Sequence, residues 1–305
     1  MFSLLSCADP LDPHRTDPHF AAETLAAREL GATVGLLDLD ALLAGDSAAA
    51  VRKVPRDRGP AWYRGWMIPS LAYAALADAL AARGTPLIVD AATYRTAHEL
   101  PGWYATFAAV TPASRWLPGP WGRVPDAAAL AELAAPLGSG PGIVKDYVKS
   151  AKHRWETACY IPDLTDITRV RRVVAAFVAE QEKYLAGGIV LRAFESFGSG
   201  AHRAPEARVW WLDGTPLLIG AHPDTPDEHP APALTHITAH VERLARPFRH
   251  HRPRQTRGRR LARHRSRRRS SLRPPRRRAP GATPRAVAQR STVISGHARN
   301  PHHRE

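Results

Sequence analysis

The sequence predicts an α/β body over its first 248 residues, followed by a separate basic tail. The body begins with a strand, a helix and a second strand, and three later strand-like stretches carry charged residues. Charge divides the chain sharply. From Arg249 to Glu305 it holds 19 arginines, no lysine and one acid, whereas the preceding part holds 24 basic and 27 acidic residues. All 22 aromatic residues precede Arg249, so we expect a disordered tail.

The N-terminal elements indicate a parallel arrangement. We expect a strand from Phe2 to Cys7, a helix from Asp17 to Leu30 that ends at Gly31, and a strand from Ala32 to Leu39. Strand, helix and strand at this spacing are typical of a parallel α/β unit. No glycine-rich phosphate loop follows the first strand, so the sequence does not predict a dinucleotide site there.

The next segment completes this unit. Trp62 to Trp66 is rich in aromatic residues and is more typical of a packing corner than of a ligand site. A helix is expected from Leu71 to Arg83, stopped by Gly84, and a strand from Pro86 to Val89.

Two helices are expected in the second half of the body. A linker rich in proline and glycine, from Leu117 to Gly122, leads to a helix from Ala127 to Ala135. A longer amphipathic helix is expected from Ile167 to Ala186. The residues predicted to form its buried stripe are Val170, Val174, Phe177, Val178 and Leu185.

Lysines mark the stretch from Gly142 to Trp155. Ile143 and Val144 begin a buried strand, and alternation would place Lys145, Tyr147 and Lys149 on one face, with Lys152 in the exit loop. Flexible cationic side chains on a strand and its exit suit an anionic ligand such as a phosphate chain. The alternative is a solvated cationic face, which is the commoner role of a lysine cluster.

Two further stretches have the same character. Gly187 to Glu195 predicts a short strand with charged residues that an ordinary core strand would lack. Residues 206–212 and 215–220 predict a hairpin with a tight Asp-Gly turn, in which Glu206, Arg208 and Trp210 share a face.

A lysine-bearing strand, a second strand and a hairpin that opens with Glu-x-Arg resemble the ATP-grasp superfamily, specifically small stand-alone ATP-grasp domains of actinobacteria. The resemblance covers about four-fifths of the chain. It implies a pre-ATP-grasp α/β subdomain over residues 1–116 and two α+β subdomains that clamp ATP over residues 117–248. This ATP-grasp fold would be incomplete at its C-terminal end, and residues 249–305 would form the disordered arginine-rich tail.

The resemblance also implies a chemistry, in which an ATP-dependent carboxylate–amine ligase acts through an acyl phosphate with magnesium as a cofactor. Lys145 would contact phosphate, with Lys149 or Lys152 as the second contact. Arg208 would stabilise the acyl-phosphate charge, although a weak ion pair between Arg208 and Glu206 is the alternative. The residues expected along the adenine, followed by those expected at the ribose or the metal, are Leu191, Arg192, Ala193 and Phe194, then Glu195 and Glu206.

The tail departs from this family. ATP-grasp domains of this kind continue beyond a Pro-Phe like Pro247-Phe248 into two strands that carry metal-binding carboxylates, and the arginine-rich sequence offers none there. Arginine without lysine is typical of GC-rich DNA translated out of frame. With a surplus base after the Phe248 codon, permitted codons read Val-Thr-Ile-Asp-Leu-Ala and then Trp-Arg-Val-Ile-Glu-Val-Gly-Asp-Gly. The codons of Arg252, Arg265 and Arg268 would then encode the carboxylates, so our hypothesis is a frameshift.

As written, the chain is therefore expected to lack its magnesium ligands and to be inactive or impaired. Loss of two strands should expose apolar edges on Ile189 to Phe194 or on the hairpin. Two other functions remain open: binding of nucleic acid or another polyanion through the tail, and a role as a nucleotide-binding pseudo-enzyme. The expected partners are ATP and a small-molecule or peptide carboxylate.

The compartment is inferred from what the sequence lacks. Cys7 and Cys159 are too few for a disulfide framework and lack metal-ligand spacing, which fits a reducing cytoplasm. No apolar run reaches transmembrane length, and Phe2 to Cys7 is too short for a signal sequence, so no membrane association is expected.

Overall fold

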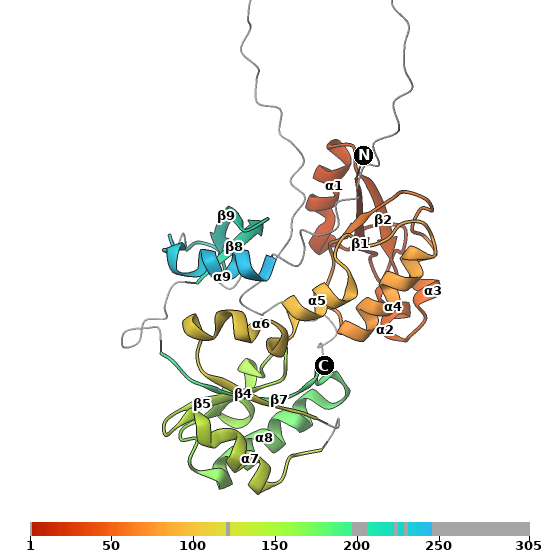
Figure 1. The fold of residues 1–305 in the computed structure, drawn as a ribbon. Coiled ribbons are helices and arrows are strands. Elements are labelled where there is room, and N and C mark those ends of the chain that lie inside the picture. Colours follow the sequence, from red (N-terminus) through yellow and green to blue (C-terminus); the bar gives the residue numbers. More distant parts are fainter. Residues whose placement is uncertain (1, 120–122, 197–205, 223–224, 229–230, 246–305) are drawn as a thin grey trace, which may run out of the picture.

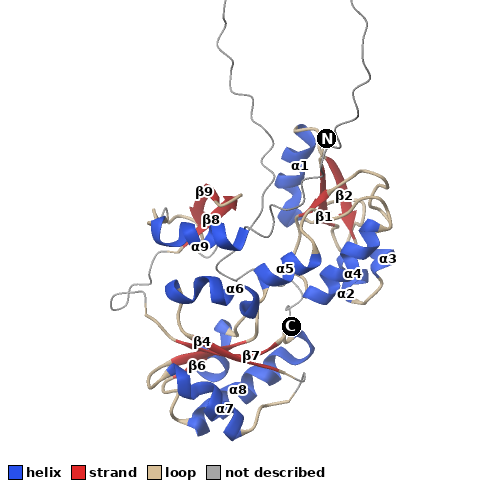
Figure 2. Ribbon diagram, in the orientation of Figure 1, coloured by secondary structure: helices blue, strands red, loops and turns tan. Residues whose placement is uncertain are grey.

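The computed structural model describes residues 2–119, 123–196, 206–222, 225–228 and 231–245. In these ranges it contains three sheets, with strand orders β2-β1-β3, β4-β7-β5-β6 and β8-β9 (Figure 1). Helices lie against each of them (Figure 2). The mixed α/β class predicted from the sequence is confirmed, whereas the predicted tail lies outside the described residues.

The first sheet is parallel, as predicted. It consists of β1 (Ser3–Cys7), β2 (Thr33–Leu37) and β3 (Ala61–Tyr63). Its core includes Leu5 and Leu37, packed against residues from the helices. The helices associated with this sheet are α1 (Ala21–Glu29), α2 (Leu39–Leu43), α3 (Ser47–Ala50) and α4 (Ser70–Ala81).

Two predictions in this region were wrong. The aromatic stretch expected to form a packing corner begins with strand β3, which pairs with β1. Pro86 to Val89 forms no strand of its own and makes only an isolated bridge through Leu87 to Ala61. The backbone there bonds to Ala61 alone, and a proline has no N–H with which to extend the ladder.

The structure adds two helices that the sequence did not predict, α5 (Ala91–His98) and α6 (Leu100–Phe107). Pro101 and Gly102 suggested a connection. Proline is nevertheless tolerated in the first turn of a helix, which is where Pro101 lies. Gly102 packs against the backbone of Thr96 so closely that a side chain would not fit.

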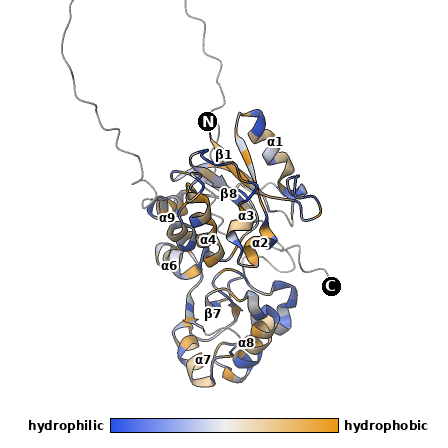
Figure 3. Ribbon diagram, turned by 90° about the vertical axis from the view of Figure 1, so that its right-hand side faces the viewer, coloured by the Kyte–Doolittle hydropathy of each residue, from blue (hydrophilic) through white to orange (hydrophobic). Residues whose placement is uncertain are grey.

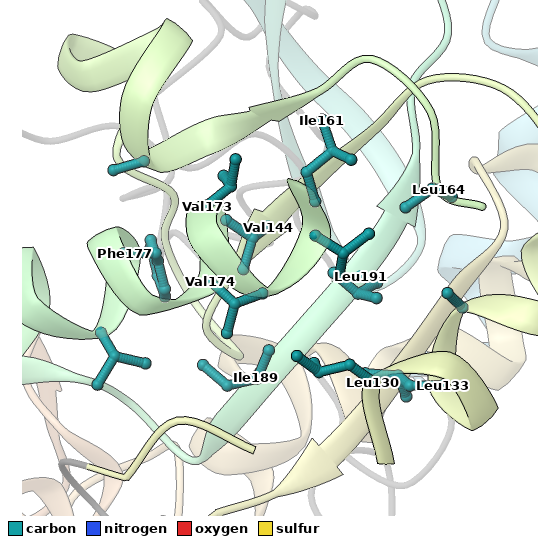
Figure 4. Close-up of a cluster of buried hydrophobic side chains, with 14 of the residues drawn as sticks. Leu130, Leu133, Val144, Ile161, Leu164, Val173, Val174, Phe177, Ile189 and Leu191 are labelled. Atoms are coloured by element: carbon teal, nitrogen blue, oxygen red, sulfur yellow. The ribbon is translucent and has the colours of Figure 1, made fainter. Parts of the chain in front are cut away.

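The second sheet is antiparallel and has a helix layer on each face. Its strands are β4 (Ser114–Pro118), β5 (Gly142–Lys145), β6 (Tyr160–Ile161) and β7 (Gly188–Ala193). On one face lie α7 (Ala127–Ala134) and α8 (Ile167–Gln181), whose apolar side chains meet those of β5 and β7 (Figure 4). The opposite face packs on α6. The buried stripe predicted for the long helix is confirmed.

Strand β4 occupies the start of the stretch predicted to be a linker. The predicted division at residues 116/117 therefore falls inside a strand that pairs with β7.

The third sheet is the predicted hairpin, formed by β8 (Ala207–Leu212) and β9 (Thr215–Ala221). Asp213 and Gly214 both have positive φ, 50° and 84°, as a type I′ turn requires. Helix α9 (Thr235–Ala245) packs between the hairpin and α6, through Val241 and Leu244. Helices α6 and α9 lie side by side in both views (Figures 1 and 3).

One arginine links the hairpin to the first sheet. Arg64 follows β3, forms a two-pronged ion pair with Glu23, and lies 5.3 Å from the ring centre of Phe20. Its guanidinium is also 5.5 Å from the ring centre of Trp210 on β8. The carboxyl end of the parallel sheet therefore meets one face of the hairpin at Arg64.

Of the two apolar edges expected to be uncovered, one is buried and one is exposed. Ile189, Val190 and Leu191 of β7 are buried. On β9, Leu217, Leu218 and Ile219 are 46, 55 and 43% exposed. In the part of the chain that the structure describes, no helix is long and apolar enough to cross a membrane.

Candidate functional site

Lys145 is the last residue of β5, and its side chain lies on the face of the sheet opposite α7 and α8, because its neighbour Val144 points into the α7–α8 core. Its ammonium group donates to the carbonyl of Val148 at 3.2 Å. The pKa of Lys145 is lowered to about 8, chiefly by burial and also by the positive charges of Arg192 and Lys152, while Asp146 opposes the shift. A bound anion would relieve this cost, which makes Lys145 a well-placed phosphate ligand.

A buried aspartate shapes the turn after Lys145. The Oδ1 of Asp146 accepts the backbone N–H groups of Val148 at 2.7 Å and Lys149 at 2.5 Å, and its Oδ2 accepts the N–H of Ala186 at 3.0 Å. Burial raises the pKa of Asp146, with these N–H groups and Lys145 opposing the shift. The carboxylate thus fastens the lysine turn to the chain just before β7.

This turn corrects the predicted alternation. The strand ends at Lys145, so Tyr147 and Lys149 do not continue its pattern. Tyr147 is buried and packs with Leu100 and Val190. The ammonium group of Lys149 lies 5.7 Å from the ring centre of Tyr184.

The loop beyond the turn separates its basic residues. His153 and Arg154 pair with Glu180 of α8 at 2.8 and 3.4 Å. Lys152 is exposed and lies near enough to Lys145 to lower its pKa. Of the two candidates for a second phosphate contact, Lys152 therefore shares the electrostatic environment of Lys145, whereas Lys149 lies at Tyr184.

Arg192 is a further cation in this environment. It faces the same side of β7 as Val190 and lies opposite Ile143 of β5. Its guanidinium donates to the hydroxyl of Thr111 at 2.7 Å. Burial lowers the pKa of Arg192, whereas Tyr104 and Glu195 oppose the shift. Lys145, Lys152 and Arg192 thus form a cationic cluster near the ends of β5 and β7.

The other residues predicted along the adenine differ in accessibility. Leu191 is buried in the core on the α8 side, and its backbone lies between β4 and β5. The N–H of Ala193 donates to Ala113, and that of Phe194 donates to Pro141. Glu195 is exposed.

An aromatic cluster at the exit of β7 escaped the sequence analysis. Trp155 stacks on Tyr160 with 5.2 Å between ring centres, and the ring of Phe194 lies edge-on to both at 5.5 Å. Residues Trp155–Cys159 form a π-helical turn, a distortion that is common at functional sites. Flat, half-exposed rings beside a cationic cluster suit a nucleotide base and its phosphates.

Glu206 and Arg208 belong to the hairpin and not to the sheet of Lys145. The carboxylate of Glu206 lies 3.6 Å from the Nε2 of His222, a buried residue that the sequence analysis did not single out. Arg208 is half-buried on β8. Among the described residues, no three His, Cys, Asp or Glu side chains gather as a metal site would require.

Comparison with known proteins gives this geometry a family. Residues 134–249 match a family model described as an ATP-grasp domain, the third family of its clade. No curated protein gives a significant sequence match.

Several solved structures are similar to this chain. D-cycloserine synthetase DcsG has a TM-score of 0.52 and 17% identity, over 81% of this chain and 82% of that one. A RimK domain ATP-grasp protein from Sphaerobacter thermophilus DSM 20745 has a TM-score of 0.46 and 18% identity, with 81% of each chain covered. D-alanine–D-alanine ligase from Bacillus anthracis has a TM-score of 0.43 and 10% identity, over 81% and 77%. The chain thus carries an ATP-grasp domain across residues 134–249.

Proposed function

We propose that this protein binds ATP at the cationic cluster and descends from ATP-dependent ligases that activate a carboxylate as an acyl phosphate. The observation that carries the proposal is the grouping of Lys145, Lys152 and Arg192 within the segment that matches the ATP-grasp family. Three cations in a partly desolvated place hold a polyphosphate far better than they would in open water.

The remaining roles follow from position. Phe194, with Trp155 and Tyr160, would accompany the adenine, and Glu195 the ribose. Leu191 and Ala193 would support the base only through the strand that they hold in place. Arg208 would meet the acyl phosphate from the hairpin, with Glu206 nearby. The acceptor substrate would be a small-molecule or peptide carboxylate.

Magnesium does not fit the described residues by themselves. When bound in such enzymes it neutralises charge on the transferring phosphoryl group. The carboxylates that would hold it are expected beyond Phe248, where the only acid is Glu305. We therefore propose that the chain, as written, binds ATP but transfers phosphate poorly, and that a shifted reading frame removed the metal-binding strands. The exposed apolar side chains of β9 support this proposal.

Replacing Lys145 by alanine is expected to weaken ATP binding about ten- to a hundredfold, because a charged hydrogen bond contributes roughly 1.5–3 kcal/mol. Isothermal titration with ATP measures this effect. Lys53→Ala is the matched control, since it removes a lysine whose ammonium group donates to Pro13, beside the first sheet. Equal affinity of the two variants would count against the cationic cluster as the phosphate site.

Binding of ATP above about pH 8 should also take up a proton. Lys145, with its pKa lowered to about 8, is partly neutral there, and a phosphate beside it would raise that pKa again. Calorimetry in buffers of different ionisation enthalpy measures the uptake, which Lys145→Met should abolish. Without ATP, the unfolded chain binds more protons than the folded one between the folded pKa and the ordinary value, so stability should rise with pH across that interval.

The arginine-rich tail supports a second candidate function, sequence-independent binding of a polyanion. If the tail binds DNA, the affinity should fall steeply as salt rises, because each neutralised phosphate releases a counterion. Fluorescence anisotropy with a labelled duplex, compared between the full chain and a chain ending at Phe248, measures it. Equal affinity of the two chains for DNA would exclude the tail as the binding element.

A further inference from the structure

Strand β9 is the outer strand of a two-stranded sheet. Its inner edge pairs with β8 along the whole hairpin. Across the described residues, neither a third strand nor a loop pairs with its outer edge. An uncovered strand edge of this kind is a template for pairing with another chain.

The neighbours of the hairpin leave β9 uncovered on both faces. Helix α9 packs on one face, where it meets Trp211 and Val209 of β8. On the other face, Arg64 lies against Trp210, which also belongs to β8. Leu217 and Ile219 on one side and Leu218 on the other remain about half exposed.

We infer that β9 pairs with β9 of a second copy of this chain, antiparallel and across a two-fold axis. The chain itself offers no better occupant, since the sequence beyond Phe248 holds 19 arginines and no aromatic residue, and hydrated guanidinium groups do not cover aliphatic side chains. The sequence of β9, Thr-Pro-Leu-Leu-Ile-Gly-Ala, contains no ionisable side chain. Two copies therefore meet no like-charge repulsion along the strand, the usual protection of an exposed edge.

The sequence of β9 fits such an axis through Leu218. Leu217 then lies opposite Ile219 of the other copy, and Leu218 lies opposite its own equivalent. At the ends, Thr215 faces Ala221 and Pro216 faces Gly220. If Leu217 and Ile219 exchange the hydrogen bonds, Pro216 is not required to donate one. The product is a four-stranded antiparallel sheet, which is more stable than an isolated hairpin.

A cysteine at the axis tests this register in the full chain. Cys7 and Cys159 are buried, so Leu218→Cys introduces an accessible thiol opposite its own copy. With copper phenanthroline as oxidant, in about 0.5 M salt to screen the tails, this variant should form a disulfide-linked dimer within minutes. Leu11→Cys, at a site that is 96% exposed on another part of the molecule, is the control. Equal cross-linking rates for the two variants would overturn the register.

Analytical ultracentrifugation tests the association without a cross-link. The unaltered chain should sediment as a monomer–dimer equilibrium that depends on concentration. Ile219→Lys sets an ammonium group against the apolar partner strand and should raise the dimer dissociation constant about tenfold or more, whereas Leu11→Lys should leave it unchanged. Circular dichroism verifies that both variants are folded. A chain that stays monomeric at every concentration, or one that forms open-ended aggregates, would overturn the inference.

Discussion

Replacing Asp146 by alanine is expected to lower the free energy of unfolding by about 3–5 kcal/mol, because the change leaves three buried N–H groups without their acceptor. The side chain is fully buried and joins the lysine turn to Ala186. Urea unfolding followed by tryptophan fluorescence measures the loss. Asp146→Asn retains one acceptor oxygen and should lose about half as much.

The effect of Asp146 on stability should also depend on pH. Because burial raises its pKa in the folded protein, its contribution is largest in acid and diminishes as pH rises through that raised pKa. The difference in stability between the unaltered chain and Asp146→Ala should therefore shrink from acid toward neutral pH. A difference below about 1 kcal/mol at every pH would mean that water replaces the carboxylate and that the turn does not depend on it.

Removing one base after the Phe248 codon is expected to produce a chain whose ATP consumption with a suitable carboxylate exceeds that of the written chain about a hundredfold or more. Metal-binding carboxylates would return, and the charge stabilisation that they permit is worth several kcal/mol. Coupled detection of ADP measures the rate, and chelation of magnesium should abolish the gain.

The first step of that experiment is to sequence the DNA across the same codon. A surplus base would make the restored chain the natural protein. If the written frame stands, the restored chain is still informative, with ATP binding to the unaltered chain as its control. ATP binding without any gain in turnover would refute the frameshift hypothesis and leave the nucleotide site intact.

Local signals were sufficient for the elements whose ends depend on neighbouring residues. Gly31 and Gly84 end helical segments with positive φ, and Asp213 with Gly214 makes the predicted turn. Strand β4 and helix α6 were missed because their order depends on distant partners. Ser114 of β4 is held by the hydroxyl of Tyr104 on α6, a contact that no local pattern reveals.

The candidate site shows the same limit. Three clustered lysines and a charged strand identified the segment, but alternation failed at Asp146, whose side chain replaces the strand ladder with a turn. Thr111, which receives Arg192, lies 81 residues away in sequence. Trp155 and Tyr160 came together with Phe194 only in the folded sheet. Tryptophan after a lysine-rich loop is the one signal that could have drawn attention to that cluster.

The strand order β4-β7-β5-β6 has a consequence for synthesis. Strands β4 and β5 each pair with β7 and not with one another, yet β7 is the last of the four to leave the ribosome. Until residue 193 has emerged, α7 and α8 have only a partial sheet to cover, and their apolar faces stay accessible. Slow decoding before β7 should therefore increase chaperone capture, whereas slow decoding after it should not.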